Sequence, residues 1–282
     1  MKSHPVAENY LEVKDHAYSQ ELFFLQANQE GTLLHTTPLP SNLDSYYSVD
    51  SYISHQKNFN SFSDKLYKWA HKFQLKRKER LLLKHLNGPK KILDFGAGSG
   101  NFVTFLKQRQ WHVLGVEPNP NARAVALENN SVLHPSLAAI PKQQFQLITL
   151  WHVLEHVEDY KQTVEELLAV LAPGGHLVLA LPNFTSWDAQ HYKSFWAAYD
   201  VPRHLWHFSP KAICNLAEEK NLQLVKTYPM PLDAFYVSLV SERFKKNPMA
   251  LPVGFLKGAF SNFHALRSGN YSSMIYVLQK AN

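Results

Sequence analysis

Two carboxylates and a glycine-rich turn are the residues of this sequence best suited to bind a charged small molecule. A short apolar run ends in Asp94, and the motif GAGSG follows at 96–100. Because glycine has no Cβ, the backbone of such a turn can lie directly against a ligand. A second apolar run, 112–116, ends in Glu117. A buried strand, a glycine turn and a following helix are typical of a site for a nucleotide-type cofactor.

The spacing of the glycines separates two classes of cofactor. The dinucleotide fingerprint GxGxxG would place its third glycine at Asn101, whereas here it comes one residue earlier, at Gly100. The Asp94 carboxylate would repel a pyrophosphate and pair with the α-ammonium of an amino acid. Glu117 is placed to accept hydrogen bonds from two ribose hydroxyls. A ligand with an ammonium group, a ribose and no phosphate is S-adenosylmethionine (SAM), and its demethylated product is S-adenosylhomocysteine (SAH).

Four motifs resemble those of class I SAM-dependent methyltransferases and occur in that family's order. LDFGAGSG at 93–100 is similar to the first motif and GVEP at 115–118 to the second. LWHVLEHV at 150–157 resembles the fourth-strand motif of the small-molecule branch that modifies quinones and sugars, and LAPGGH at 171–176 resembles the turn before the fifth strand. The resemblance implies a Rossmann-like α/β fold and a SAM site formed by Asp94, Phe95, Gly96, Ala97, Gly98, Gly100, Glu117, Pro118, Trp151 and His152.

The residues directly after the fourth predicted strand have more than one interpretation. Trp151 could form an aromatic wall for the positive sulphur of the cofactor, or it could simply pack in the core. His152 is expected to contact the methionine or adenosine portion of SAM. His156 is either a structural histidine or an alternative catalytic base. A zincin-type metal site would need a glutamate beside the first histidine, but Glu155 precedes the second, so no metal is expected.

A second cluster of polar and aromatic residues, YDVPRHLWHFSP at 199–210, has neither helical nor strand periodicity. Polar groups gathered without a regular scaffold are typical of a site, and the stretch resembles the loop that supplies a base in related small-molecule methyltransferases. His204 is predicted to be the base because histidine titrates near neutral pH, with Tyr199, Asp200 and Arg203 orienting it or the acceptor. In the alternative, Asp200 pairs with Arg203 to hold the loop, and His204 caps the following helix.

Alternating strand and helix patterns over residues 61–228 predict a mostly parallel sheet with helices on both faces. A cationic amphipathic helix is expected at 62–84, directly before the first strand. The resemblance implies seven strands, of which the last is antiparallel. These strands are predicted near 91–95, 112–116, 131–133, 145–150, 176–181, 222–228 and 272–277.

The chain is predicted to consist of a ribbon-like segment at 1–60 and a methyltransferase domain at 61–282, with a helical insert at about 229–268. The insert is expected to pack in the core or to cover the acceptor. The first segment is similar to a zinc ribbon that precedes the catalytic domain in many relatives. Two alanines stand among the four positions that would bind zinc, so the segment is expected to fold without metal. Those positions are His4, Ala7, Ala27 and Glu30.

The charge of the protein is concentrated in one segment. The net charge is +6, and residues 61–91 contain ten cations and two acids. A solvated helix face explains this pattern, although an acidic substrate, a membrane surface or nucleic acid would also fit it. No nucleic-acid-binding module accompanies the basic residues, so no nucleic-acid partner is expected. Stable membrane insertion is not expected either, because no apolar stretch approaches ~18–20 residues.

Taken together, the residues predict a SAM-dependent methyltransferase that modifies oxygen or nitrogen of a small-molecule acceptor, such as a sugar, a lipid intermediate or a quinone-like compound. A cytoplasmic location is expected because Cys214 is the only cysteine. The oligomeric state is left open. Two alternatives remain: a SAM- or SAH-binding module without turnover, and an NAD-dependent oxidoreductase, which the glycine spacing and Asp94 disfavour.

Overall fold

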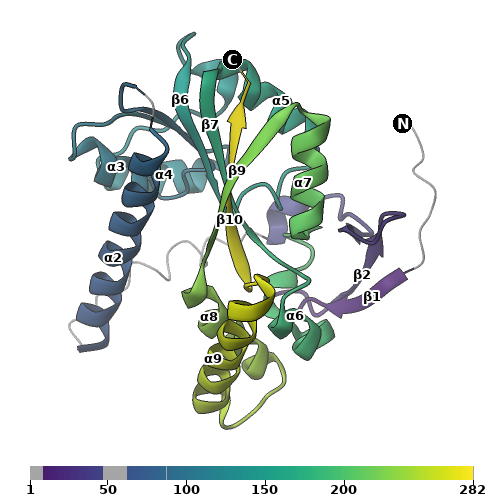
Figure 1. Ribbon diagram of the computed structural model, residues 1–282. Coiled ribbons are helices and arrows are strands. Elements are labelled where there is room, and N and C mark those ends of the chain that lie inside the picture. Colours follow the sequence, from purple (N-terminus) through teal and green to yellow (C-terminus); the bar gives the residue numbers. More distant parts are fainter. Residues whose placement is uncertain (1–8, 47–61, 87, 282) are drawn as a thin grey trace. The chain divides into compact units, whose positions relative to one another are not determined.

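The computed structural model describes residues 9–46, 62–86 and 88–281 (Figure 1). His4 and Ala7, two of the positions compared with a zinc ribbon, lie outside these ranges. The chain forms two compact units. The first unit contains the described parts of Met1–Tyr47, His152–Lys161 and Leu179–Val277, and the second contains the described parts of Ser48–Trp151, Gln162–Val178 and Leu278–Asn282.

Three parallel strands carry the glycine turn. β4 (Lys91–Phe95) pairs in parallel with β5 (His112–Val116) on one side and with β6 (Phe145–Trp151) on the other. Ile92 of β4 lies opposite Val113 and Leu147, and all three side chains are buried. Apolar runs of this kind are typical of strands that are covered on both faces. The segments that follow β4 and β5 therefore leave the sheet at the same carboxyl-terminal edge.

The full sheet has six strands in the order β5-β4-β6-β7-β10-β9, with β7 at Leu171–Pro182, β9 at Leu222–Pro229 and β10 at Ser273–Lys280. Hydrogen bonds at the two ends of β10 give its direction. The Asn183 N–H, just after β7, donates to Ser272 O (2.8 Å), and Gln279 Nε2 donates to Gly174 O (3.2 Å). Since the end of β7 meets the start of β10, the last strand is antiparallel, as predicted.

The prediction of a strand at 131–133, and hence of seven strands, is wrong. These residues have no strand geometry, and a single isolated bridge joins Val116 to His134. Pro135 follows directly, and proline has no N–H with which to extend a ladder. The Val132 side chain is 67% exposed, whereas Ser131 and Leu133 are buried.

Four helices of the methyltransferase segment fit the predicted alternation of strands and helices, and the first of them spans the predicted residues 62–84. The clearest start is that of α4, where the Asn119 side chain accepts hydrogen bonds from the N–H groups of Asn121 (2.9 Å) and Ala122 (3.2 Å). Pro120 occupies the first helical position, where its missing N–H costs nothing. These helices are α2 (Phe62–Lys84), α3 (Asn101–Lys107), α4 (Pro120–Glu128) and α5 (Tyr160–Val170).

The predicted helical insert consists of two helices, α8 (Pro231–Phe244) and α9 (Ala250–Ser268), which lie side by side (Figure 1). The remaining helices are α6 (Trp187–Tyr192), α7 (Pro210–Glu219) and the short 3-10 turns η1 (Leu43–Tyr46), η2 (Leu137–Ala139), η3 (Lys193–Phe195) and η4 (Ala197–Tyr199). Among the described helices, none has the length and the apolarity that a crossing of a lipid bilayer requires.

A separate four-stranded sheet begins the chain, in the order β1-β2-β3-β8. β1 (Asn9–Lys14), β2 (Leu22–Ala27) and β3 (Leu33–Thr37) are antiparallel, and β3 pairs with β8 (Trp206–Phe208) from the predicted acceptor loop. The absence of periodicity at 199–210 led to the expectation of a loop without a strand. The structure corrects this, because the partner of β8 is far away in the sequence.

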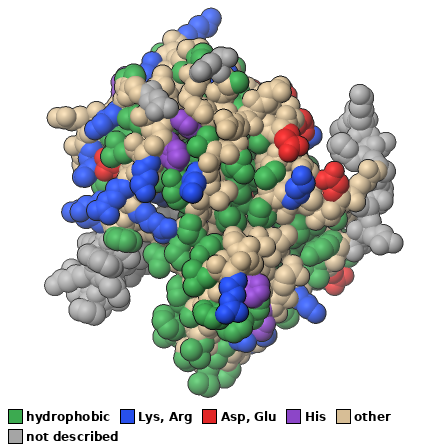
Figure 2. Space-filling view, viewed as in Figure 1, with side chains coloured by type: hydrophobic (Ala, Val, Ile, Leu, Met, Phe, Trp, Pro, Cys, Tyr) green, Lys and Arg blue, Asp and Glu red, His purple; other side chains and the backbone are tan. Residues whose placement is uncertain are grey.

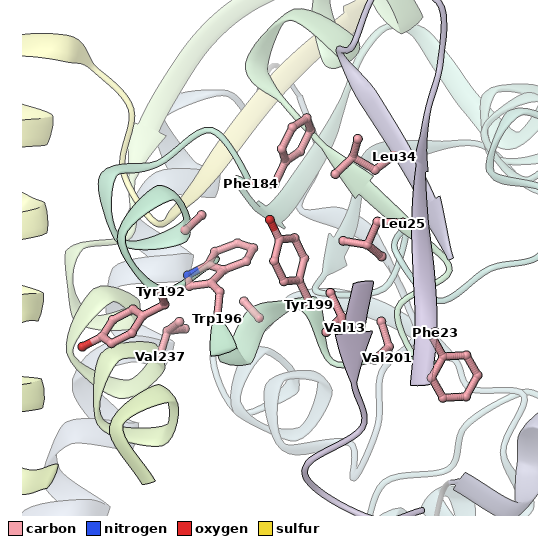
Figure 3. Packing of buried hydrophobic residues seen from close by; sticks show 12 residues of the cluster. Val13, Phe23, Leu25, Leu34, Phe184, Tyr192, Trp196, Tyr199, Val201 and Val237 are labelled. Carbon is pink, nitrogen blue, oxygen red and sulfur yellow. The ribbon is translucent and has the colours of Figure 1, made fainter. Parts of the chain in front are cut away.

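An apolar cluster lies against this sheet (Figure 3). Leu25 and Leu34 from the strands are buried together with Trp196 and Tyr199 from the segment around η4. The Trp196 and Tyr199 rings are nearly perpendicular, with centroids 5.0 Å apart. Burial of these large side chains fixes the segment that immediately precedes Asp200.

The segment between β2 and β3, where Ala27 and Glu30 were compared with zinc ligands, is a hydrogen-bonded hairpin turn. Ala27 ends β2, and the Asn28 side chain accepts hydrogen bonds from the Thr32 N–H (2.8 Å) and the Leu33 N–H (3.1 Å). Glu30 accepts a hydrogen bond from Asn215 Nδ2 of α7 (2.7 Å). Asn28 thus holds this turn, and the expectation that the segment folds without zinc stays a prediction.

A buried carboxylate joins three elements of the first unit. Asp188 in α6 accepts hydrogen bonds from Trp196 Nε1 (2.8 Å), Ser261 Oγ of α9 (2.7 Å) and Ser272 Oγ (2.6 Å). The Asp188 residue has no exposed surface. A charge removed from water is tolerated only when donors replace the solvent, so these three contacts are required for the fold.

We therefore expect Asp188→Ala to lower the free energy of unfolding by about 3–5 kcal/mol, because three buried donors lose their acceptor. Urea denaturation followed by circular dichroism measures the change. The control is Glu128→Ala, at an exposed position of α4, which should stay within ~0.5 kcal/mol of the wild type. An equally small effect of Asp188→Ala would contradict the assigned network.

Candidate functional site

The Glu117 carboxylate holds the glycine turn against the end of β5. Its Oε2 accepts a hydrogen bond from the Gly98 N–H (2.8 Å), and its Oε1 accepts one from the Asn119 N–H (2.9 Å). The N–H groups of Gly96 and Ala97 both donate to Val116 O (2.8 and 2.9 Å). Each carboxylate oxygen of Glu117 can accept further hydrogen bonds, so the predicted contacts with ribose hydroxyls are compatible with this geometry.

The glycines leave room beside this turn. Gly96, Gly98 and Gly100 all have positive φ, between +54° and +72°, a region that other residues enter at a cost. A Cβ added to Gly98 would meet no atom within 4 Å, whereas one added to Gly100 would lie 2.6 Å from Ser131 Cβ. Gly98 therefore presents bare backbone to open space, and Gly100 is needed for close packing.

Asp94, at the end of β4, is almost completely buried. Its Oδ1 accepts a hydrogen bond from Thr149 Oγ1 on the neighbouring strand β6 (2.6 Å). Burial raises the pKa of Asp94 to about 6, against the opposing effects of the Thr149 hydrogen bond and the Lys78 charge. An ammonium group placed beside this carboxylate would favour its ionised form, which is the interaction expected with the amino-acid portion of SAM.

Trp151 presents one aromatic face to a cation. Lys78 Nζ of α2 lies 4.2 Å from the centre of the Trp151 ring, and the Phe102 ring stands perpendicular to it at 5.9 Å. Trp151 Nε1 is buried without a hydrogen-bond partner among the described residues. A tryptophan whose face already attracts a cation and whose N–H awaits an acceptor suits a binding site better than a simple core position.

These features fit SAM. The cradle offers carboxylates at Asp94 and Glu117, bare backbone at Gly98 and a cation-binding aromatic face at Trp151. Phe95, Ala97 and Pro118, which were also predicted to bind the cofactor, lie in the same turn or directly after Glu117. Charge and hydrogen-bonding capacity therefore match an ammonium group, a ribose and a sulfonium.

His152 directly follows Trp151 in the chain and belongs to the first unit. Its backbone has a φ of +56°, which is strained for histidine, and its N–H donates to Ala180 O (3.0 Å). The imidazole lies between two carboxylates, with Nδ1 3.3 Å from Glu155 and Nε2 3.3 Å from Asp233 of α8. Burial disfavours the charged ring, but the two carboxylates outweigh it and raise the pKa of His152 to about 10.

Glu155 supports the site with its backbone as well as its side chain. Only 1% of the Glu155 surface is exposed. Burial disfavours its charge, yet the contact with His152 outweighs burial and lowers the pKa of Glu155. The Glu155 carbonyl accepts hydrogen bonds from the N–H groups of Leu205 (2.7 Å) and Trp206 (3.1 Å). The fourth-strand motif thereby holds the residues that follow His204.

The predicted base, His204, is buried and uncharged. Its Nδ1 lies 2.9 Å from Ala198 O, and its Nε2 lies 3.8 Å from the Asp200 carboxylate. Burial and the neighbouring His156 hold the pKa of His204 well below its usual range. Because a ring nitrogen facing a carbonyl must carry the hydrogen, Nδ1 is protonated and Nε2 keeps its lone pair. His204 can therefore accept a proton at Nε2.

The neighbours of His204 resolve part of the alternative interpretation. Asp200 and Arg203 form an ion pair, as that alternative expected, and Asp200 has a φ of +41°. The second half of the alternative is wrong, because the helix that follows, α7, is capped by Ser209, whose Oγ accepts from the Ala212 N–H (3.1 Å). His204 is thus available for another role.

Unlike the polar residues next to it, Tyr199 has apolar surroundings. The side chain is 1% exposed within the apolar cluster (Figure 3). Its ring stands nearly perpendicular to that of His207, with centroids 5.3 Å apart. Burial raises the pKa of its hydroxyl. An orienting role for Tyr199 stays a prediction, and packing is what its surroundings provide.

Glu155, His156 and His204 form a compact set of potential metal ligands. One donor atom from each lies within 4.8 Å of the others, and His156 Nδ1 lies 3.0 Å from Arg203 O. A backbone carbonyl at Nδ1 is the usual way in which a ligating histidine is oriented. These residues could hold an ion, and the expectation that the enzyme needs no metal stays a prediction.

A cavity of about 800 Å³ lies elsewhere in the first unit, between the β2–β3 turn and α7. None of the predicted site residues lines it. Among its charged groups, Lys161 contacts Glu219 at 2.6 Å, and Glu30 accepts a hydrogen bond from Asn215. Size alone therefore does not make this cavity the active site.

Comparison with known proteins identifies the family of the chain. A family model described as a methyltransferase domain matches residues 67–227, more than half of the 282-residue chain. The chain belongs to this methyltransferase family. The matched segment contains both the glycine turn and the predicted acceptor loop. The protein is accordingly a SAM-dependent methyltransferase.

Curated proteins similar to this methyltransferase carry the names of quinone methyltransferases. A 2-phytyl-1,4-naphtoquinone methyltransferase from Thermosynechococcus vestitus is 28% identical over 171 residues, which are 49% of this chain and 74% of that protein. A demethylmenaquinone methyltransferase from Thermus thermophilus is 33% identical over 102 residues, 32% of this chain and 46% of that protein. A ubiquinone biosynthesis O-methyltransferase from Pseudomonas fluorescens is 28% identical over 104 residues, 33% of this chain and 45% of that protein. The chain spans less than half the length of the last two.

Solved structures share the fold of this methyltransferase. A candidate sarcosine dimethylglycine methyltransferase from Galdieria sulphuraria superposes with a TM-score of 0.53 at 16% identity, covering 86% of this chain and 99% of that one. A mycolic acid cyclopropane synthase in complex with SAH and CTAB has a TM-score of 0.50 at 13% identity, covering 72% and 83%. At these identities the likeness concerns the fold alone.

Three residues of the site were missed from the sequence. Thr149 is the hydrogen-bond partner of Asp94, Lys78 lies over Trp151, and Asp233 holds His152. Thr149 could have been noticed as a polar residue inside an apolar strand. Lys78 and Asp233 carry no local signal, because each reaches the site from a distant helix.

The pKa of Asp94 makes a pH-dependent prediction. Its carboxyl group is ionised above pH ~6 and protonated below it, so SAM affinity should be constant from pH 8 to 7 and decrease as the pH falls below 6. Asp94→Asn should bind SAM at least about tenfold more weakly at pH 7.5 and lose this dependence. Isothermal titration calorimetry between pH 5 and 8 measures both. Glu128→Gln, at an exposed site, is the matched control, and a wild-type affinity that does not change down to pH 5 would contradict the role of Asp94.

Glu155 and Asp233 form a carboxylate clamp around the imidazole of His152, and this clamp also makes a pH-dependent prediction. The folded pKa of about 10 lies above the ordinary value of 6.5, so the clamp stabilises the fold fully below pH 6.5 and its contribution is lost as the pH rises to 10. Asp233→Asn should lower the pKa of His152 in an NMR titration of the imidazole resonances. The difference in stability between wild type and variant should narrow from pH 6.5 to 10. An unchanged His152 titration in Asp233→Asn would rule out this contact.

Proposed function

We propose that the protein transfers the methyl group of SAM to an oxygen or nitrogen atom of a small-molecule acceptor, and that the acceptor is a quinone-like compound with a hydroxyl group. The observation that carries the proposal is the cradle of two buried carboxylates, Asp94 and Glu117, around an open glycine turn within the matched family segment. This chemistry favours an aminoacyl nucleoside over a dinucleotide.

Each part of the cradle has a proposed role. Asp94 pairs with the α-ammonium group of the cofactor, and Glu117 accepts hydrogen bonds from its ribose. The bare backbone at 96–100 lies along the amino-acid portion. Trp151 covers the sulfonium with its aromatic face, and the same face attracts Lys78 Nζ in the ligand-free protein. When bound, SAM supplies an electrophilic methyl group, so the residues of the chain need mainly to align the acceptor with it.

His204 is the proposed base. With the hydrogen fixed at Nδ1 by Ala198 O, its Nε2 would take the proton from an acceptor hydroxyl. The acceptor oxygen would then bond to the methyl carbon as the bond between that carbon and sulphur breaks, which leaves SAH. Asp200 lies 3.8 Å from that nitrogen and would stabilise the resulting imidazolium. His152 is unsuited to the base role because a pKa of about 10 keeps it protonated near neutral pH, and it is proposed to contact the cofactor instead.

Several considerations support a quinone-like acceptor. The curated relatives described above carry quinone names, and one of them is named as an O-methyltransferase. The hydroxyl group of a reduced quinone is a weak nucleophile until its proton is removed. A neutral histidine is suited to removing that proton. Sugars and lipid intermediates remain the other acceptor classes to be tested.

A binding module without turnover is the main competing function, and dehydrogenation with NAD is the weaker one. Calorimetry with SAM, SAH and NAD distinguishes the cofactor: heat with SAM and SAH but not with NAD supports the proposal. Turnover is then measured with radiolabelled SAM and short-chain quinols, with sugars and amines in parallel. SAM binding without label transfer to any acceptor of these classes would favour the binding module.

The base assignment predicts a separation of binding from turnover. His204→Ala should bind SAM normally and lower kcat by about 10²-fold or more, and added imidazole should restore part of the activity. His207→Gln is the matched control, because His207 is an equally buried histidine whose Nε2 contacts Thr36 Oγ1 (3.0 Å). The control should reduce stability and leave kcat unchanged. Full activity of His204→Ala would remove it from the base role.

A further inference from the structure

The outer surface of α9 is unusual for a soluble protein. On most surface helices the large apolar side chains point toward the protein interior. On α9 the small residues point inward instead. Gly254, Gly258, Ser261 and Ala265 form the buried stripe of α9. Glycine is required at the first two positions, because an added Cβ would lie 2.6 Å from Leu239 Cα and 2.7 Å from Phe235 Cα of α8. The two helices therefore pack closely through small residues.

The large apolar side chains of this helix pair consequently point to solvent. Phe255 is 61% exposed, Phe263 57% and Leu266 72%. Figure 2 shows hydrophobic side chains gathered at the lower end of the view, where α8 and α9 lie in Figure 1. A contiguous apolar patch on a monomer usually marks an interaction site. The exposed members are Leu232, Tyr236, Met249, Leu251, Phe255, Leu256, Phe260, Phe263 and Leu266.

The surface charges of the α8–α9 pair all have one sign. Residues 231–268 contain two acids, and both are turned inward: Asp233 pairs with His152, and Glu242 is 2% exposed and accepts hydrogen bonds from Tyr192 and Asn247. The cations of the pair lie at or near its surface. They are Arg243, Lys245, Lys246, Lys257 and Arg267.

We propose that the outer face of α9, with the adjoining residues of α8, is a docking surface for an anionic lipid bilayer. Phenylalanine and leucine side chains would enter the boundary between headgroups and acyl chains, while the lysine and arginine side chains contact anionic headgroups. The helix would lie in the plane of the membrane. This inference does not rest on the proposed acceptor or on catalysis.

A second copy of the chain is the other occupant to consider, and the charges disfavour it. A two-fold interface brings the same patch of both copies together. The cations of one α9 would then face those of the other, with no outward acid in residues 231–268 to compensate them. An anionic bilayer instead complements every exposed charge of this face.

Vesicle flotation with the full-length protein tests the proposal. We expect binding to vesicles of 30% phosphatidylglycerol in phosphatidylcholine, at least about tenfold weaker binding to pure phosphatidylcholine, and release of the protein by high salt. Phe255→Asp/Phe263→Asp should reduce the partition coefficient at least about tenfold. Lys245→Glu/Arg267→Glu should abolish the preference for anionic lipid.

Matched controls use equally exposed residues outside the α8–α9 pair. Leu127→Asp/Val132→Asp replaces apolar side chains that are 63% and 67% exposed, and Lys107→Glu/Lys142→Glu reverses two exposed cations. Both controls should bind vesicles like the wild type, and all variants should retain the wild-type thermal melt. Loss of binding in the controls equal to that in the α9 variants would overturn the assignment to this face.

Other outcomes also overturn the proposal. Absence of binding to either vesicle, or equal binding to neutral and anionic vesicles, would exclude an electrostatic membrane surface. Analytical ultracentrifugation completes the test. If the protein forms a concentration-dependent dimer, loses it in Phe255→Asp/Phe263→Asp and shows no binding to vesicles, that combined result would assign the face to a second copy of the chain.

Discussion

A carboxylate that leaves water must receive donors in return, and this requirement organises both units of the protein. Glu117 accepts hydrogen bonds from two backbone N–H groups, which hold the glycine turn against the end of β5. Asp94 receives the Thr149 hydroxyl, and Asp188 binds three donors from separate elements. Glu155 has the imidazole of His152 3.3 Å away as its ion-pair partner. The same groups that constrain the backbone also provide the charge with which a cofactor can be recognised.

The two histidines of the site show how surroundings divide one residue type into different roles. His152 lies between two carboxylates and stays protonated to about pH 10, so it acts as a fixed positive charge. His204 lies among buried groups beside another imidazole, and its pKa is driven well below the ordinary range. The first therefore stabilises the turn after β6, and the second keeps a lone pair with which it can accept a proton.

Local patterns predicted the elements that form by local rules. The strands at 91–95 and 112–116, the helix at 62–84 and the antiparallel last strand all follow from apolar runs, helical periodicity or the family resemblance. The predicted strand at 131–133 did not form: only His134 is bridged to the sheet, and Pro135 has no N–H with which to extend the ladder. The strand at 206–208 was missed because its partner, β3, lies far away in the sequence and leaves no trace in the local pattern.

The sequence by itself determined the class of the protein: glycine spacing and the two acids that follow buried strands specify a SAM-type cradle, since their meaning depends only on near neighbours in the chain. Only the tertiary structure decided which groups complete the site. Lys78 and Asp233 reach Trp151 and His152 from remote helices, and long-range packing sets their positions. It also decided that α9 buries its glycines and exposes its phenylalanines, because close contact with α8 admits no larger side chain.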